Sequence, residues 1–542
     1  MNNISKIIIG ACSCFSLMLS TSGCIEETIP TSLILEEELS SSQKSSEALL
    51  WAMPACFNRI GVISSNYHWD WGYGSIMHIR DIMTEDFAIA TSSYDHYTAW
   101  QQNVSQGSNS IYSQFFWYYY WKSLLAVNKM IAAVDTQTAS DAQLGYLGAG
   151  YAFRAFFYLD LARMFEYLPT DKTNPVTDAG NDVTGYTVPI VKEGITEEQA
   201  RKNPRVTREE MAAFILSDLN EAETYISKLP YKEKTLPHLD VVYGLKARYY
   251  MWLGDYNNAK TYARKAIEAA DVTPMTEQEC LNTTTGFNDI NMWMWGAQYV
   301  AEDSGVMTGG LLTWTSWSSN ETYFGYAGAG PYVMIGASLY ERLSDTDFRK
   351  KMFKAPKGSS LEGATEFVDP LYGNNLPDYA SVKFRPGNGN MSDVTVGAVV
   401  GYPLMRVEEM YFIEAEAAAH INSSEGLNLL KEFMTTYRDP NYVSAATGDD
   451  LIEEIVYQKR IELWGEGQSF FDIKRLNMSV TRGYEGTNFG DATRFNTNGR
   501  PAWMNLTIVR LEEDNNPALK GWNNPDPSEA YSKWVEPGSE EE

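Results

Sequence analysis

The chain has 542 residues, 44% of them hydrophobic, and a formal net charge of −27 at pH 7. Such a chain can bury a large core, and its acidic balance makes nucleic acid a poor candidate ligand because the two would repel each other. The unusual feature is the content of 15 Trp and 34 Tyr, many of them in polar, glycine-rich segments where a core does not need them.

The first residues have the pattern of an export signal. Lys6 is the only charge before an apolar stretch, Ile7 to Leu19, that is too short to cross a bilayer. Small residues follow, and then Cys24. This order resembles a bacterial lipobox, so we expect residues 1–23 to be a lipoprotein signal peptide and Cys24 to carry the lipid. An ordinary signal peptide cut elsewhere is the alternative.

Residues 24–46 are polar and acidic and are expected to form a lipidated tether or linker. Glu26-Glu27 resembles the acidic tag that sends some lipoproteins to the outer face of the outer membrane. Two or three acyl chains give the stable anchoring that one chain does not. We therefore expect a protein that is lipid-anchored in the outer membrane and faces the cell surface. The remaining cysteines, Cys56 and Cys280, are too few for a disulfide framework, and whether they bridge is left open.

Residues 47–542 are expected to form a single, mainly α-helical domain. Apolar residues at helical spacing predict helices at 151–165, 207–228, 240–253, 257–270, 404–419, 424–437 and 449–464. Thr207 followed by Glu210 predicts a reciprocal capping box at the start of the second of these.

One helical hairpin has a repeat-like sequence. The segment 254–270 (GDYNNAKTYARKAIEAA) resembles the second half of a tetratricopeptide repeat, with Gly254 at the turn, Ala259 at a close helix contact, and Ala266 and Ile267 on the buried face. A generic helical hairpin is the alternative. The predicted fold is a tetratricopeptide-like helical hairpin scaffold, over about 120–270 and 404–476, with large irregular loop-rich insertions.

Two regions, about 60–115 and 275–400, are rich in aromatic residues, and helical periodicity is weak or absent in them. A long irregular region inside a helical domain is more often functional than merely connecting. We therefore expect these two regions to carry the ligand-binding loops.

Several segments, in order along the chain, resemble the SusD/RagB family of outer-membrane nutrient-binding lipoproteins. They are residues 150–163 (its Arg-Ala-Phe-x-Tyr helix), 188–191 and 205–207 (its next landmarks), 406–417 (its R-x-x-E … A-E-A helix) and 460–475 (its closing block). The departures are Gln458-Lys459 in place of Glu-Arg and Ser469 in place of Arg, which put a salt bridge in doubt.

The resemblance implies a SusD-like fold and a binding protein, not an enzyme. Its implied role is to capture a nutrient, usually a glycan, and deliver it to a SusC-like TonB-dependent transporter. The charged motif residues Arg406, Glu409, Glu462 and Glu466 have spacings that more often tie helix ends together than catalyse. We expect them to be structural.

Candidate ligand residues lie in both loop regions. Trp100-Gln101-Gln102-Asn103 resembles the Trp-Gln-x-Asn element of the starch-binding member of the family. Aromatic planes cover the apolar face of a sugar, and amides pair with its hydroxyls, so Trp100, Gln101 and Asn103 are predicted to bind an oligo- or polysaccharide. Further predicted stacking residues are Trp293, Trp295, Trp314, Trp317 and Tyr323. For each tryptophan, packing of a loop against the scaffold is the alternative.

The sequence shows no HExxH, GxGxxG or GxSxG motif. The spacing of His68, His78 and His96 does not predict a metal site. No cofactor is expected, although a structural calcium is left open. Two other functions are also left open: a peptide-binding lipoprotein of the same transporter-lid type, and a surface glycosidase with two carboxylates in a cleft.

Overall fold

The computed structural model describes residues 43–90, 96–284 and 286–538. The predicted signal peptide, Cys24 and most of the predicted tether lie outside these residues. The first described helix, α2 (Gln43–Ala52), begins inside the predicted tether, and its Ser46 is buried. Within the described ranges, no helix has both the length and the apolar character needed to span a membrane.

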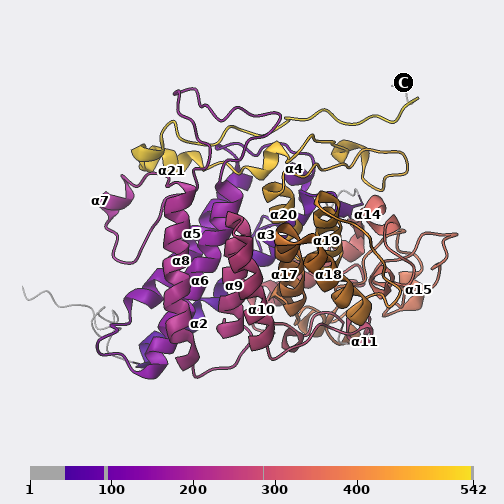
Figure 1. Cartoon of the computed structure of the whole chain (residues 1–542), viewed down its shortest axis with the longest axis horizontal. Helices are drawn as coiled ribbons and strands as arrows, with labels where there is room; N and C mark the ends of the chain where they lie inside the picture. The colour runs from indigo at the N-terminus through magenta and orange to yellow at the C-terminus, as the bar shows by residue number, and fades with distance from the viewer. Residues whose placement is uncertain (1–42, 91–95, 285, 539–542) are drawn as a thin grey trace, which may run out of the picture.

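The architecture is mainly helical, which confirms the predicted fold class. The long helices are α5 (Ile111–Ala132), α6 (Asp141–Phe165), α8 (Arg208–Tyr225), α9 (Leu239–Leu253), α10 (Tyr256–Ala269), α17 (Val407–Ile421), α18 (Ser423–Tyr437) and α19 (Asp449–Glu462). They stand side by side in Figure 1, with α6 packed against α5 and α8, and α10 packed against α9 and α17. The α10–α17 contact joins the two halves of the scaffold across the long insertion.

Local sequence signals set the ends of these helices. The predicted capping box is present, with the Thr207 side chain bonded to the Glu210 N–H and Glu210 reaching back to Thr207. A second box, Ser140 with Gln143, starts α6 ten residues before the predicted start. Gly145 lies inside this added part, where a Cβ atom would come within 2.4 Å of the Leu229 backbone nitrogen. The glycine therefore permits a close approach of the chain after α8.

The predicted hairpin at 254–270 is α9 followed by α10. Gly254 ends α9 in the left-handed region at φ 74°, and the Asp255 side chain caps α10. Ala259 and Ala266 are fully buried, as predicted, while Ile267 is partly buried. Small side chains at these positions let the two helices approach closely.

Among the described residues of the insertion between α10 and α17, the α-helices and strands are all short. They are α11 (Glu277–Cys280), β2 (Trp295–Gln298), α12 (Ser304–Met307), α13 (Trp314–Ser318), β3 (Val333–Ile335), α14 (Ala337–Glu341), α15 (Pro370–Gly373), α16 (Val394–Gly397) and β4 (Gly401–Met405). Two antiparallel pairs tie this insertion to the rest: β3 pairs with β1 (Phe87–Ile89), with Ala88 opposite Met334, and β2 pairs with β4. The first pair brings the two predicted loop regions together.

Other elements also differ from the predictions. The region 60–115 contains α3 (Tyr73–Ile82), an unpredicted helix whose every residue is buried. It also contains the start of α5 at Ile111. The helix α17 begins at Val407, because Leu404 and Met405 belong to β4.

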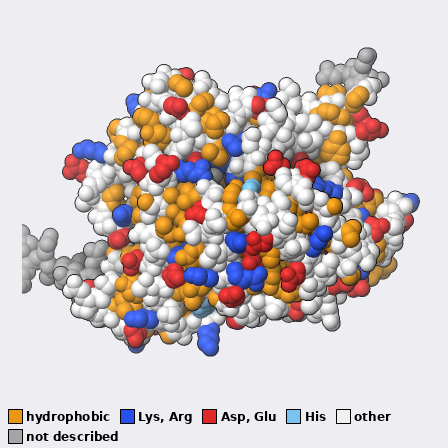
Figure 2. Space-filling view, in the orientation of Figure 1, with side chains coloured by type: hydrophobic (Ala, Val, Ile, Leu, Met, Phe, Trp, Pro, Cys, Tyr) orange, Lys and Arg blue, Asp and Glu red, His pale blue; other side chains and the backbone are white. Residues whose placement is uncertain are grey.

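The remaining helices are short: α4 (Thr98–Gln101), α7 (Glu197–Ala200), α20 (Ser469–Arg475) and α21 (Arg510–Asn515). The segment after α20 is largely irregular and crosses one end of the long helices in Figure 1. Figure 2 shows acidic, basic and hydrophobic side chains interspersed over one face. Cys56 and Cys280 are both buried and free.

Candidate functional site

Seven of the eight predicted ligand residues are buried. Trp100, Gln101, Asn103, Trp293, Trp295, Trp314 and Trp317 each expose 5% or less of their surface. The eighth, Tyr323, exposes 61%. Whether the seven buried residues contact a ligand stays a prediction. Of the eight, Tyr323 is the one whose ring is exposed to solvent in this arrangement of the loops.

Contacts within the molecule account for the buried residues. Trp314 stacks on Tyr402 with ring centroids 4.8 Å apart, and Trp295 meets Phe156 edge-on at 4.9 Å. The Asn103 side-chain amide donates to the Pro527 carbonyl at 3.0 Å. These contacts pack loops against the scaffold, which is the alternative that the sequence left open.

The two predicted loop regions meet in a chain of aromatic rings. Trp100 lies 5.7 Å from Tyr97, and Tyr97 meets Trp317 edge-on at 4.8 Å. Trp317 in turn stacks on Tyr326, with centroids 4.3 Å apart and planes inclined by 15°. The fold therefore brings Trp100 and Trp317, which the sequence predicted separately, into one aromatic cluster. Both rings are buried inside the protein.

Two histidines lie at the accessible edge of this cluster. His68 and His96 are half-buried, with rings 4.8 Å apart, and His68 Nδ1 contacts the Tyr326 hydroxyl. Burial and the neighbouring His68 lower the pKa of His96. Sequence reasoning did not group these histidines because only the fold brings them together. Across the described ranges, no three His, Cys, Asp or Glu side chains are placed to hold a metal ion.

An aromatic pair in the second loop region consists of the exposed Tyr323 and the half-buried Tyr372. Tyr323 meets Tyr372 edge-on, with centroids 5.2 Å apart. The Tyr372 hydroxyl lies 3.0 Å from the Asn320 carbonyl and 2.9 Å from the Gly328 carbonyl, and its single O–H donates to these two acceptors in turn or shares between them. The Tyr323 backbone N–H donates to Met391 O at 2.8 Å, so both rings are attached to ordered loops.

The surroundings of this pair combine apolar and polar groups. Leu371, next to Tyr372, exposes 82% of its surface, and the exposed amides Asn374 and Asn375 follow. We call Tyr323, Tyr372, Leu371, Asn374 and Asn375 the tyrosine platform. Sequence reasoning found Tyr323 but missed Tyr372, whose only sequence signal was its place in the predicted loop region.

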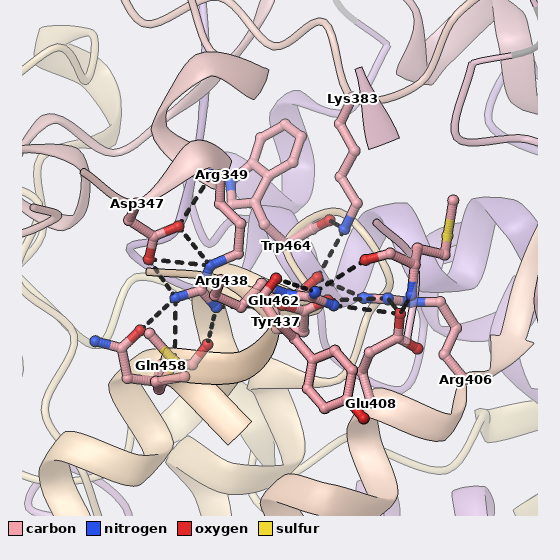
Figure 3. Close-up of polar contacts among 12 residues, drawn as sticks. Asp347, Arg349, Lys383, Arg406, Glu408, Tyr437, Arg438, Gln458, Glu462 and Trp464 are labelled. Carbon is pink, nitrogen blue, oxygen red and sulfur yellow. Dashed lines mark hydrogen bonds and ion pairs between the residues drawn. The ribbon is translucent and has the colours of Figure 1, made fainter. Parts of the chain in front are cut away.

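The charged motif residues form a buried network (Figure 3). Glu462 accepts from Arg438 at 2.7 Å, Arg406 at 3.0 Å and Arg349 at 3.2 Å. Glu466 accepts from Lys383 at 2.6 Å. Burial by itself would raise the pKa of Glu462, but the charges of Arg438 and Arg406 outweigh it and hold the pKa well below its usual value. The burial and pairing of these charges agree with the predicted structural role, which stays a prediction.

The remaining motif charges are also paired. Glu409 accepts from Arg248 at 2.6 Å, which ties α17 to α9. Lys459, at one departure from the family pattern, forms an ion pair with Asp472 at 3.0 Å. The other departure, Ser469, is buried, and its hydroxyl has no partner among the described residues.

Comparison with known proteins gives two family matches. A model of the SusD family matches residues 354–532, and a model described as starch-binding associating with outer membrane matches residues 38–251. The SusD-like protein P38 of Formosa agariphila is 21% identical over 423 residues, covering 70% of this chain and 75% of that protein.

Solved structures share the fold. A SusD-like carbohydrate binding protein from Bacteroides vulgatus superposes with a TM-score of 0.66 at 22% identity. The superposition covers 88% of this chain and 97% of the Bacteroides vulgatus chain. A SusD-like carbohydrate binding protein from Bacteroides fragilis superposes with a TM-score of 0.61 at 16% identity. The superposition covers 89% of this chain and 99% of the Bacteroides fragilis chain.

Proposed function

Because the chain belongs to the SusD/RagB family, we propose that it is a non-catalytic, cell-surface glycan-binding lipoprotein. In this proposal it captures an oligo- or polysaccharide and delivers it to a partner SusC-like TonB-dependent transporter. The names of the structural relatives support carbohydrate as the ligand class. The observation that carries the proposal is the tyrosine platform, in which the exposed Tyr323 ring lies against the half-buried Tyr372 ring in a predicted ligand loop.

The chemistry of the platform suits a sugar. The exposed Tyr323 ring can cover the C–H face of a pyranose, and the amides of Asn374 and Asn375 can pair with its hydroxyls. The contacts of Tyr372 with backbone carbonyls hold its ring before the ligand arrives, so little side-chain entropy is lost on binding.

The membrane attachment rests on Cys24. We expect Cys24→Ala to release the protein from membranes into the aqueous phase of a detergent partition, because the acyl chains supply the anchoring. Protease added to intact cells should digest the wild-type protein. A mutant that partitions like wild type, or a wild type that protease cannot reach, would contradict this part of the proposal.

The ligand class can be tested by calorimetry of the full chain in detergent against a panel of polysaccharides and oligopeptides. The proposal predicts saccharide binding without release of reducing sugar. Binding of peptides alone would replace it with the peptide-binding function, and release of reducing sugar during the titration would replace it with a glycosidase.

A further inference from the structure

A second concave site lies in the helical scaffold, away from the tyrosine platform. It is a cavity of about 330 Å³ where α6 and α9 end and α8 and α10 begin, and α20 and Arg500 complete its wall. Arg500 comes from the C-terminal segment that crosses this end of the helices in Figure 1. This volume suits a small ligand and not a long polysaccharide.

The wall of this cavity is strongly cationic, although the whole chain is acidic. Seven of its lining side chains are Lys or Arg and three are Asp or Glu. Two further carboxylates outside the lining, Asp160 and Glu416, pair with the lining residues Arg163 and Arg475. Counting both of them still leaves an excess of two positive charges.

Two lining cations lack a carboxylate partner among the described residues. Lys474, which is buried, donates to the carbonyls of Met164 at 2.9 Å and Glu166 at 2.8 Å. Arg500 donates to the carbonyls of Lys474 at 2.8 Å and Pro169 at 3.0 Å. Backbone carbonyls satisfy these donors only in part, because an ammonium has three N–H groups and a guanidinium five.

The electrostatics around Lys474 agree with this geometry. Burial lowers the pKa of Lys474 well below its usual value; Glu166 opposes the shift, and Arg500 and Arg205 add to it. An anion in the cavity would offset the repulsion from the arginines.

The guanidinium groups are held in place before any ligand binds. Arg163 lies over the Phe471 ring, with its Cζ atom 3.6 Å from the ring centroid. Arg208 pairs with Glu166 at 3.2 Å and also donates to the Trp252 carbonyl. Planar, fixed guanidinium groups are the side chains best suited to bind oxyanions through paired hydrogen bonds.

We propose that this cavity binds a small oxyanion: sulfate, phosphate or the carboxylate of an acidic sugar unit. Arg500 supplies positive charge that no carboxylate pairs with among the described residues, Lys474 supplies N–H donors, and Arg163 and Arg208 also line the cavity. The site is independent of the tyrosine platform, so it stands or falls separately from the proposed function.

The test is calorimetry of the full chain in detergent with sulfate, phosphate and glucuronate, at an ionic strength held constant with chloride. We expect binding that Arg500→Gln weakens by at least about tenfold and that Arg500→Lys largely retains. Arg201→Gln is the matched control, because Arg201 is exposed just after α7 and does not line the cavity. This variant should bind the anions like wild type.

The anions distinguish the source of the ligand. Sulfate or phosphate binding without glucuronate binding assigns a free inorganic ion, whereas glucuronate binding that sulfate displaces assigns an acidic sugar. A thermal unfolding curve of each variant, recorded without anion, shows whether the variant is folded. Absence of binding for all three anions, or equal weakening by Arg500→Gln and Arg201→Gln, would overturn the proposal.

Discussion

Glu462 is the residue on which the scaffold depends most, because three arginines converge on one buried carboxylate. A buried charge is tolerated only where partners offset its lost hydration, and removing one partner leaves the others uncompensated. Arg406, Arg438 and Arg349 would each lose an ion pair if Glu462 were neutral. Their number explains why this carboxylate belongs to the fold and not to a reaction.

We expect Glu462→Gln to lower the free energy of unfolding by about 3–5 kcal/mol, measured by urea denaturation. Glu453→Gln is the control: Glu453 is 61% exposed in its pair with Arg342, so its removal should cost no more than about 1 kcal/mol. Glycan affinity per folded molecule should stay unchanged in both. Loss of glycan binding with wild-type stability in Glu462→Gln would assign it to the ligand site instead.

At the scale of elements, the α9–α10 hairpin depends on one backbone position. Gly254 has φ 74°, and an added Cβ atom there would meet nothing within 4 Å. The cost of a side chain at this position is therefore the strain of the left-handed backbone alone.

We expect Gly254→Ala to destabilise the protein by roughly 1–2 kcal/mol, and Gly254→Asn to cost less because asparagine tolerates this conformation. Thermal unfolding of the two variants and of wild type, under the same conditions, measures both changes in stability. An alanine variant as stable as wild type, or an asparagine variant less stable than alanine, would show that backbone strain does not control this turn.

The sequence predicted these helices because their signals are local. The capping pair Thr207–Glu210 and the turn at Gly254 act within a few residues, and each lies in the predicted place. The helix α3 was not predicted, because the burial of its polar residues depends on partners far away in the sequence, such as Asp160 for Arg80.

The orientation of the loop tryptophans could not be predicted, because it depends on partners far away in the sequence. Trp314 is buried by stacking on Tyr402, and Trp295 by meeting Phe156. A tryptophan beside glycine and serine has the same local sequence whether it packs inward or binds a ligand. The platform partner Tyr372 was missed for the same reason, since its neighbour Tyr323 is distant along the chain.

At the scale of the whole molecule, cations are concentrated inside an acidic protein. The fully buried side chains include Arg80, Arg349, Arg385, Arg406 and Arg482, while the net charge is −27. Where such cations outweigh burial and lower the pKa of a buried carboxylate, as at Glu462, folding stability depends on pH.

Asp472 gives the clearest pH window. Burial would raise its pKa, but Lys459 and Arg475 outweigh burial and lower the pKa from 3.8 to about 2. A depressed pKa stabilises the fold fully above the unfolded-state value and less as pH falls toward the folded-state value. We therefore expect the contribution of Asp472 to be complete above pH 3.8 and to be lost as pH falls through about 2.

Urea denaturation at a series of pH values, for wild type and Asp472→Asn, checks this. The variant should be less stable than wild type at neutral pH, and the difference should shrink as pH falls through that window. A difference that is constant with pH would show that Asp472 is not held ionised by its neighbours.

The central claim is that the tyrosine platform binds a glycan, and the most direct measurement is the affinity of Tyr323→Ala for the saccharide that wild type binds. Removing one stacking ring should cost about 1–3 kcal/mol, as it does for stacked bases, or roughly a factor of 10 to 100 in affinity. Tyr323→Phe keeps the ring and should bind nearly as wild type. Val443→Ala, which changes a residue 86% exposed and outside the platform, should have no effect. Wild-type affinity in Tyr323→Ala would contradict the claim.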